Sequence, residues 1–349
     1  MKIIVTGGCG FIGSCLIKYL LTIPNMQVIN IDKLTYSSNL LSLKNFVNKK
    51  NYVFKKFDIV NTAKVLAVLE EFKPNGIINL AAETHVDRSI DNPDIFLKSN
   101  ILGTHSLLEA TRIYLNKIKN KNFKFVHIST DEVYGELKRK QKKFTEQSNY
   151  CPKSPYSASK ASSDHLVLSW FHTYKVPTII TNCGNNFGPS QHPEKLIPHT
   201  ILSALNNKKI TVYGNGQNIR DWIYVQDHVE SIYQIFKKGI VGEKYNIGAN
   251  NELANIDVVK FICNILDKIK PLKKESYKNL IAYVSDRPGH DLRYALNTSK
   301  INNTISWKSK YKFYESLLST VIWYIAEFPK WKKGLKKKYH LRRIGTIKS

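Results

Sequence analysis

The N-terminal half of the chain alternates between two kinds of residue pattern. Short runs rich in β-branched and aromatic residues are typical of strands, and longer stretches of helical pattern lie between them. We expect the strands at 2–7, 27–32, 52–58, 76–82, 123–129 and 177–182, and the helices near 11–22, 61–72, 94–117 and 155–174. This alternation predicts an α/β fold, a doubly wound parallel sheet of the Rossmann type with helices on both faces.

The pattern loosens after about residue 188, where a loop with three prolines (188–198) leads into mixed short strands and helices. A chain of 349 residues is suited to two packed domains. We expect a dinucleotide-binding domain at 1–188 and a smaller mixed α/β substrate domain at 189–330, of which some segments return to the first domain. The basic cluster after residue 330 predicts a solvated tail at 331–349.

A formal net charge of +26 is typical of proteins that bind nucleic acids. The basic residues are diffuse, whereas a nucleic-acid footprint should be a localised stripe, so we expect no nucleic-acid partner. No apolar run has the length of a membrane span, and the start, MKIIVTGG, does not resemble a secretory signal. Five scattered cysteines indicate neither a disulfide framework nor a metal site. We therefore expect a cytoplasmic protein without a membrane partner.

A glycine-rich turn, TGGCGFIG (6–13), follows the first strand. Gly7, Gly10 and Gly13 permit a tight turn, let the backbone approach a pyrophosphate and bring the next helix close to the strand. The helix N-terminus then faces the phosphates. Asp32 ends the second strand, where an acid accepts hydrogen bonds from the adenosine ribose and repels a 2′-phosphate, which favours NAD over NADP. Asp58 has two open interpretations, a contact to the adenine amino group or the N-cap of the helix from Asn61.

The helix that starts in SPYSASK (154–160) carries Tyr156 and Lys160 four residues apart, on one face. Such a pair is often only a surface pair, but here it accompanies a dinucleotide site. A phenol is a poor base at neutral pH, and a nearby ammonium and an oxidised nicotinamide would lower its pKa. We expect Tyr156 to take a proton from a substrate hydroxyl, and Thr130 to hydrogen bond to the same oxygen.

Two adjacent acids, Asp131 and Glu132, follow the strand at 123–129 directly. The tip of this strand is expected at the carboxyl edge of the sheet, where α/β proteins bind ligands. The residues alone leave two interpretations open, a solvated acidic turn that caps the next segment or a pair that transfers protons.

Several motifs resemble those of the dTDP-glucose 4,6-dehydratase family, within the extended short-chain dehydrogenase/reductases. The matching stretches are TGGCGFIGS (6–14), INLAAETHVDRSI (78–90), HISTDEVYG (127–135), SPYSASKASSDHLV (154–167), TNCGNNFGP (181–189), PEKLIP (193–198), RDWIYVQDH (220–228), YNIGANNE (245–252) and DRPGHDLRYA (286–295). The resemblance implies oxidation of the sugar at C4, loss of water across C5 and C6, and return of the stored hydride to C6. Elimination needs a base and an acid, and the resemblance assigns Glu132 as the base and Asp131 as the acid.

The resemblance also implies individual site residues. The implied catalytic residues are Thr130, Asp131, Glu132, Tyr156 and Lys160. The implied NAD contacts are Gly7, Gly10, Phe11, Ile12, Gly13, Asp32, Lys33, Leu34, Thr35, Asp58, Ile59, Leu80, Ala81, Ala82, Glu83, Ser99, Tyr156, Lys160 and Asn186. The implied contacts to the nucleoside-diphosphate sugar are Thr84, Thr130, Asn185, Lys195, Leu196, Tyr213, Arg220, Asn255, Arg287 and His290. Guanidinium groups pair bidentately with phosphate oxygens, so Arg220 and Arg287 suit a diphosphate.

The favoured function is therefore dehydration of dTDP-glucose, a step of deoxysugar (rhamnose-type) biosynthesis. The same reaction on UDP-glucose stays open, since one methyl group on the base is worth only ~1–3 kcal/mol. A nucleotide-sugar 4-epimerase would not need the two acids, and a non-enzymatic NAD-binding module would need neither these nor Tyr156 and Lys160. The family also pairs the helices near 94–117 and 155–174 across a two-fold axis, which implies a homodimer.

Overall fold

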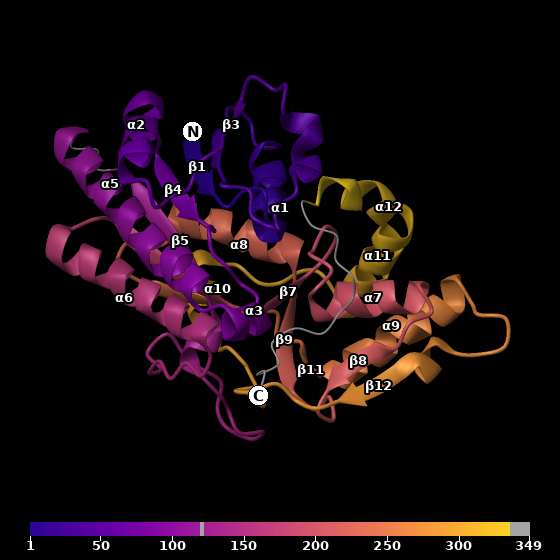
Figure 1. The fold of residues 1–349 in the computed structure, drawn as a ribbon. Coiled ribbons are helices and arrows are strands. Elements are labelled where there is room, and N and C mark those ends of the chain that lie inside the picture. Colours follow the sequence, from indigo (N-terminus) through magenta and orange to yellow (C-terminus); the bar gives the residue numbers. More distant parts are fainter. Residues whose placement is uncertain (119–121, 336–349) are drawn as a thin grey trace.

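A seven-stranded sheet is the centre of the larger unit of the molecule (Figure 1). The computed structural model describes residues 1–118 and 122–335. All neighbouring strands in this sheet are parallel. Their order across the sheet is β3 (Tyr52–Lys55), β2 (Gln27–Ile31), β1 (Lys2–Thr6), β4 (Gly76–Asn79), β5 (Lys124–Thr130), β6 (Thr178–Cys183) and β10 (Lys244–Ile247). The first six strands have the order of a dinucleotide-binding doubly wound sheet, which confirms the predicted fold class.

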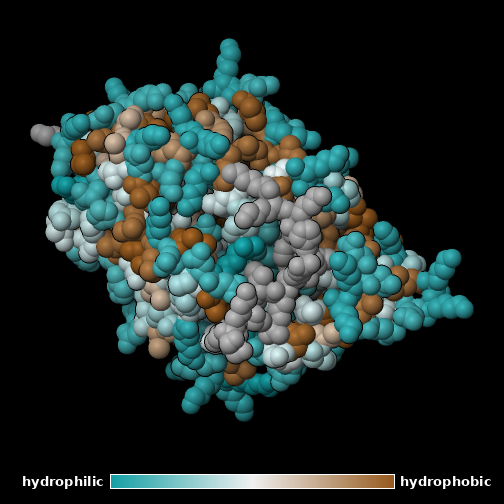
Figure 2. Space-filling view, viewed as in Figure 1, coloured by the Kyte–Doolittle hydropathy of each residue, from teal (hydrophilic) through white to brown (hydrophobic). Residues whose placement is uncertain are grey.

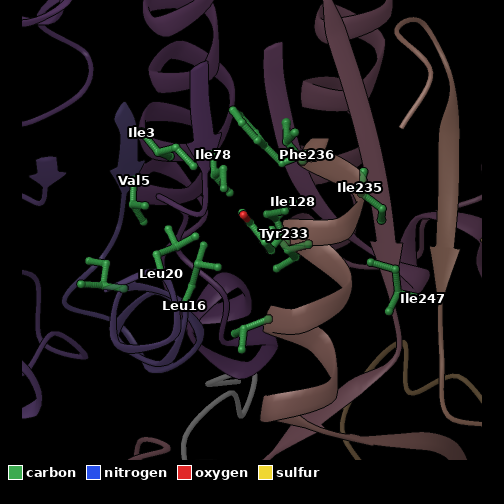
Figure 3. Packing of buried hydrophobic residues seen from close by; sticks show 14 of the residues in the cluster. Ile3, Val5, Leu16, Leu20, Ile78, Ile128, Tyr233, Ile235, Phe236 and Ile247 are labelled. Carbon is green, nitrogen blue, oxygen red and sulfur yellow. The ribbon is translucent and has the colours of Figure 1, made fainter. Parts of the chain in front are cut away.

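Helices cover both faces of this sheet because buried parallel strands carry apolar side chains on both faces. In β1, Ile3 and Val5 pack towards α1 and α8, whereas Ile4 packs towards the helices of the other face. Figure 3 shows the first of these layers, with Tyr233 of α8 among the strand residues. The first face carries α1 (Phe11–Leu20), α8 (Val225–Lys238) and α10 (Ser299–Ile305), and the second carries α2 (Thr62–Phe72), α5 (Gly103–Ile118) and α6 (Pro155–Tyr174).

A smaller unit with its own apolar core lies beside the carboxyl edge of the large sheet (Figure 1). It contains two short sheets, one with β7 (Asn185–Phe187), β9 (Ile219–Tyr224) and β11 (Glu252–Ala254), the other with β8 (Ile210–Tyr213) and β12 (Ile281–Val284). Its helices are α7 (Leu196–Leu205), α9 (Asn255–Ile269), α11 (Phe313–Ala326) and α12 (Phe328–Trp331). Part of the chain between 225 and 305 returns to the large sheet, as α8, β10 and α10.

Short helical turns complete the framework, and several of them carry site residues. They are η1 (Leu40–Phe46), α3 (Val86–Asp91), α4 (Asp94–Phe96), η2 (Leu97–Leu102), η3 (Asp131–Tyr134), η4 (Tyr277–Leu280) and η5 (Lys332–Gly334). The single helix expected near 94–117 is built from α4, the π-helical turn η2 and α5. Within the described ranges, no helix has both the length and the apolar character needed to cross a bilayer.

The basic segment expected to be a solvated tail from residue 331 begins with a docked side chain. Trp331 is buried, and its indole Nε1 donates to Ser42 Oγ at 2.8 Å. Asn39 Nδ2 donates to the Trp331 carbonyl, also at 2.8 Å. The predicted tail therefore starts too early, because Trp331 buries its ring against η1. Residues 336–349 of the predicted tail lie outside the described residues.

Candidate functional site

Two adjoining cavities lie where the carboxyl ends of the sheet strands meet the smaller unit. The larger has a volume of about 260 Å³ and the smaller about 190 Å³. The residues that line both cavities are Glu132, Asn185, Asn186, Gln191, Glu194 and Lys195. Ligands of open α/β sheets bind at this edge, so the two cavities form the candidate site.

The glycine turn forms the floor of the larger cavity, and its geometry leaves no room for side chains. Gly7 has a φ of +69°, which L side chains rarely adopt. A Cβ on Gly13 would lie 2.3 Å from the Gly7 carbonyl oxygen and 2.8 Å from Gly8 Cα. The backbone therefore approaches closely at the start of α1, as a bound pyrophosphate requires. The residues present fit a dinucleotide.

Replacing Gly13 by alanine is expected to weaken NAD binding by more than about tenfold, which corresponds to ~1.4 kcal/mol. The added methyl group must push α1 away from the Gly7 carbonyl, and this moves the amides that face the pyrophosphate. Titration of the nucleotide-free protein with NAD measures the affinity, and the thermal midpoint checks that the variant is folded. A folded variant with wild-type affinity would show that the turn does not approach the pyrophosphate.

Asp32 is buried at the end of β2 and lines the larger cavity. It accepts hydrogen bonds from the backbone amides of Cys9 (2.9 Å) and Leu34 (2.7 Å) and from Ser38 Oγ (3.1 Å). Burial raises the pKa of Asp32, while these three donors lower it. The carboxyl group is thus held rigidly where a ribose is expected.

Asp58 does not cap the next helix. Asn61 is the N-cap of α2 and accepts from the Lys64 amide, so the N-cap interpretation of Asp58 is wrong. Asp58 lines the larger cavity and forms an ion pair with Lys33 at 3.4 Å, and Lys33 Nζ also donates to Ser99 Oγ at 2.6 Å. Asp58 therefore remains a predicted cofactor contact.

The structure brings the two predicted sets of contact residues to the two cavities. Every predicted NAD contact except Leu34 lines the larger cavity. Leu34 is buried beside it and donates its backbone amide to Asp32 Oδ1. Of the predicted substrate contacts, Thr84 and Thr130 line the larger cavity and the rest line the smaller one. Arg220 reaches the smaller cavity, but its guanidinium donates to the backbone carbonyls of residues 219, 291 and 292 and stacks 4.3 Å from the Tyr294 ring.

The two adjacent acids lie in η3, directly after β5, where the cavities meet. Asp131 is fully buried, and its Oδ1 accepts from Thr130 Oγ1 at 3.3 Å. Burial and then the charge of Glu132 raise the pKa of Asp131 well above its usual range. Burial also raises the pKa of Glu132, but Arg287, Lys195 and Arg220 oppose this rise. The surroundings therefore favour a protonated Asp131 beside a Glu132 that ionises more readily.

Tyr156 lies in the first turn of α6, which starts at a capping box formed by Ser154 and Ser157 with Pro155 between them. Its ring packs edge-on against Phe96, with centroids 6.3 Å apart. Burial and then the charge of Glu132 raise the pKa of Tyr156 well above 10, and a hydrogen bond with Thr130 opposes this. The protein groups alone therefore keep the phenol protonated.

The expected lowering of the Tyr156 pKa by Lys160 stays a prediction, because the protein groups taken together raise this pKa. Lys160 Nζ donates to the Ile128 carbonyl at 2.8 Å and contacts His127 Nε2 at 3.2 Å. Burial lowers the pKa of Lys160 to about 8, and the charge of Asp164 opposes this. We expect the oxidised nicotinamide, together with Lys160, to supply the lowering of the Tyr156 pKa that proton transfer needs.

Sequence reasoning missed Asp164, a buried carboxylate whose charge acts on Lys160. Asp164 Oδ2 accepts from Ser129 Oγ (2.8 Å) and Tyr150 Oη (2.9 Å), and Oδ1 lies 3.4 Å from His127 Nε2. The signal was present in the sequence, because Asp164 follows Lys160 by four residues on the same helix face.

Sequence reasoning also missed Glu194, which lines both cavities. Its carboxylate accepts from Tyr36 Oη at 2.7 Å and from Arg88 Nε at 2.9 Å. The Arg88 guanidinium lies 3.8 Å from the centre of the Tyr36 ring. Glu194 thereby joins the loop after β2 and helix α3 to the loop that precedes α7. The PEKLIP motif contains this residue, but its charge pairing over such sequence distances is not readable from one sequence.

This sheet order, with the glycine turn at β1 and Tyr156 and Lys160 on α6, is the architecture of the extended short-chain dehydrogenase/reductases. The chain matches the model of the GDP-mannose 4,6 dehydratase family over residues 4–320. It is 48% identical to a dTDP-glucose 4,6-dehydratase of Neisseria meningitidis over 99% of both chains. It is also 48% identical to dTDP-glucose 4,6-dehydratase 1 of Escherichia coli K12 over 96% of each.

Solved structures agree with these relatives. A dTDP-glucose 4,6-dehydratase from Bacillus anthracis in complex with NAD superimposes with a TM-score of 0.85 at 44% identity, covering 95% of this chain and 99% of that one. The dTDP-glucose 4,6-dehydratase DesIV from Streptomyces venezuelae, with NAD bound, gives a TM-score of 0.88 at 35% identity over the same shares. The chain belongs to the dTDP-glucose 4,6-dehydratase family, which confirms the resemblance.

Proposed function

We propose that the protein dehydrates dTDP-glucose to the 4-keto-6-deoxyglucose nucleotide, with NAD as its cofactor. The observation that carries this proposal is the acid pair directly after β5, in which Glu132 lines both cavities and Asp131 lies buried beside it and lines the larger one. Elimination of water needs one protonated and one ionised group. The relatives' names and the NAD-bound neighbours support the same assignment.

Tyr156 and Thr130 act on the C4 hydroxyl in this proposal. Both line the larger cavity. Tyr156 accepts the proton of that hydroxyl, and Thr130 holds the oxygen by a hydrogen bond. When bound, NAD supplies the acceptor for the C4 hydrogen and returns that hydrogen to C6. Lys160 contributes a buried positive charge held by the Ile128 carbonyl and the His127 ring.

The acid pair acts after oxidation, because the C4 ketone acidifies the hydrogen at C5. Glu132 removes the C5 proton, and its ionised form is favoured by Arg287, Lys195 and Arg220. Asp131 gives its proton to the departing C6 hydroxyl, and the burial of Asp131 keeps that proton in place until then. The burial of Asp131 and the positive neighbours of Glu132 thus favour the two protonation states that these steps require.

A 4-epimerase is the main alternative from another class, since solved epimerases share this fold at 26% identity. Epimerisation at C4 requires no acid–base pair for C5 and C6, so it leaves Asp131 and Glu132 without a role. The reaction is tested by incubating the purified protein with dTDP-glucose and, separately, with UDP-glucose. Formation of a 4-keto-6-deoxy sugar nucleotide supports dehydration, the ratio of the two rates decides the base, and a galactose nucleotide would contradict the proposal.

We expect the protein to be a homodimer through α5 and α6. These helices lie side by side on one face of the sheet (Figure 1), and hydrophobic side chains lie among hydrophilic ones over them (Figure 2). Leu97 and Leu102, just before α5, are 46% and 53% exposed. Light scattering at micromolar concentration should give twice the chain mass. Leu102→Glu should lower it to one chain mass, whereas Val47→Glu, at another exposed apolar position, should not.

A light-scattering mass of one chain for the wild-type protein would contradict the proposed dimer.

We place the enzyme in the cytoplasm on the basis of its cysteines. All five are free thiols in the structure, and three of them are buried. Unpaired thiols are typical of proteins in reducing compartments.

A further inference from the structure

Within the described residues, the guanidinium group of Arg287 is held by Asp87 at one nitrogen, Nη1, and has no partner at another, Nε. Arg287 lies in the loop between β12 and α10 and lines the smaller cavity. Its Nη1 donates to Asp87 Oδ1 at 2.9 Å. Its Nε is buried and has no hydrogen-bond partner in the described part of the chain. A buried, unpaired donor is costly, so a ligand acceptor is expected to satisfy it when the cavity is filled.

Asp87 divides its two oxygens between two side chains of the other unit. It belongs to α3, which follows the large sheet, whereas Arg287 and Tyr213 belong to the smaller unit. While Oδ1 accepts from Arg287, Oδ2 accepts from Tyr213 Oη at 2.9 Å. Asp87 is itself buried and lines the smaller cavity. One carboxylate therefore fixes the two side chains across the cleft between the units.

Two opposite effects on an anionic substrate follow from this arrangement. The negative charge of Asp87 repels a diphosphate and partly neutralises Arg287, which would weaken binding. Against this, the contact of Asp87 with Nη1 leaves Nε without a partner in the described residues, and Nε and Nη2 together form an edge that matches two phosphate oxygens. An arginine without this anchor would lose side-chain entropy each time it ordered around the substrate.

Positively charged side chains in the smaller cavity oppose this repulsion. Lys195, Arg220 and Arg287 line it, against the acids Asp87, Glu132 and Glu194. Glu194 is engaged by Arg88 and Tyr36, outside this group. Burial is the largest effect on the pKa of Asp87 and raises it, but the charges of Arg287 and His85 and the hydrogen bonds from Arg287 and Tyr213 together lower it. The carboxylate therefore remains ionised as an anchor.

We propose that Asp87 is a positioning residue for the substrate, which directs the Nε–Nη2 edge of Arg287 at the diphosphate and holds Tyr213 beside it. This proposal rests on the proposed function, because it takes the occupant of the smaller cavity to be a nucleoside diphosphate. It assigns Asp87 no contact with the reacting atoms. Its contribution should therefore appear in substrate affinity and not in the chemical steps.

The test is a double-mutant cycle with dTDP as the probe, measured by calorimetry on the NAD-loaded protein. Asp87→Asn is expected to weaken dTDP binding about tenfold in the wild-type background. In the Arg287→Gln background the same change should cost less than about twofold, because the group that Asp87 positions is gone. The KM for dTDP-glucose should rise with Asp87→Asn, while kcat should stay within about twofold.

Two further variants separate positioning from charge and from folding. Asp87→Glu keeps the charge but moves the carboxylate, so it should also weaken dTDP binding, and it provides the test if Asp87→Asn does not fold. Asp94→Asn, an exposed acid nearby, is the control and should bind dTDP as the wild type does. Equal losses from Asp87→Asn in both backgrounds, or tighter dTDP binding, would overturn the proposal. Failure of the wild-type protein to bind dTDP would instead contradict the proposed function.

Discussion

Replacing Tyr156 by phenylalanine should reduce turnover of dTDP-glucose by about 10²–10⁴-fold, the usual contribution of a general base. The phenylalanine ring keeps the packing against Phe96 but cannot accept the proton of the C4 hydroxyl. Steady-state formation of the keto sugar gives the rate, and calorimetry with dTDP gives the affinity. We expect the affinity to remain within about threefold, because the smaller cavity does not include Tyr156.

The structure sharpens this prediction, because burial and Glu132 keep Tyr156 protonated in the protein alone. The first chemical step of the wild-type enzyme should therefore quicken as pH rises, since the reactive phenolate becomes more populated. The variant should lose this dependence. The pH dependence of Thr130→Val is a useful comparison, because this variant lacks the hydroxyl group whose hydrogen bond with Tyr156 opposes the rise in the pKa of Tyr156. A loss below about tenfold for Tyr156→Phe would show that another group is the base.

Asp131→Asn and Glu132→Gln should each block dehydration while sparing oxidation at C4. Both replacements keep the shape of the side chain and remove its ability to transfer a proton. Losses of about 10²–10⁴-fold in keto-deoxysugar formation are expected. Because oxidation depends on Tyr156, the 4-keto-glucose nucleotide should accumulate in a single turnover, together with the absorbance of the reduced nicotinamide.

Exchange at C5 in deuterated water separates the roles of the two acids. Asp131→Asn retains Glu132 and should still exchange the C5 hydrogen of the ketone, although it cannot protonate the C6 hydroxyl. Glu132→Gln should not exchange it. Exchange in Glu132→Gln but not in Asp131→Asn would show that the roles of base and acid are assigned the wrong way round. Dehydration by both variants at the wild-type rate would show that neither acid takes part in the reaction.

The sequence sufficed for the features that depend on local pattern. The alternation of strand and helix patterns predicted the parallel sheet, and the glycine turn with Asp32 predicted the edge at which the larger cavity lies. The Tyr156–Lys160 spacing placed both residues on α6. These features follow from hydrophobic period and backbone sterics, which act over a few residues.

The features that the sequence did not reveal depend on which distant groups meet. Lys160 turns to the Ile128 carbonyl, a pairing between a helix and a strand that spacing along the helix cannot show. Asp87 and Arg287 are 200 residues apart in the chain, yet they form one ion pair across the cleft. Trp331 fell within a run of basic residues, and composition alone suggested a solvated segment there. Tertiary packing determines each of these outcomes.

The most direct test of the account follows a single hydrogen through the reaction. Dehydration by this site requires that the hydrogen removed from C4 returns to C6 of the same sugar while C5 gains its hydrogen from solvent. dTDP-glucose with deuterium at C4 should therefore give a 4-keto-6-deoxy nucleotide with one deuterium at C6, and mixing it with a heavier-labelled glucose nucleotide should give no crossover. Deuterium retained at C4 of an epimerised sugar, or lost to water, would contradict the account.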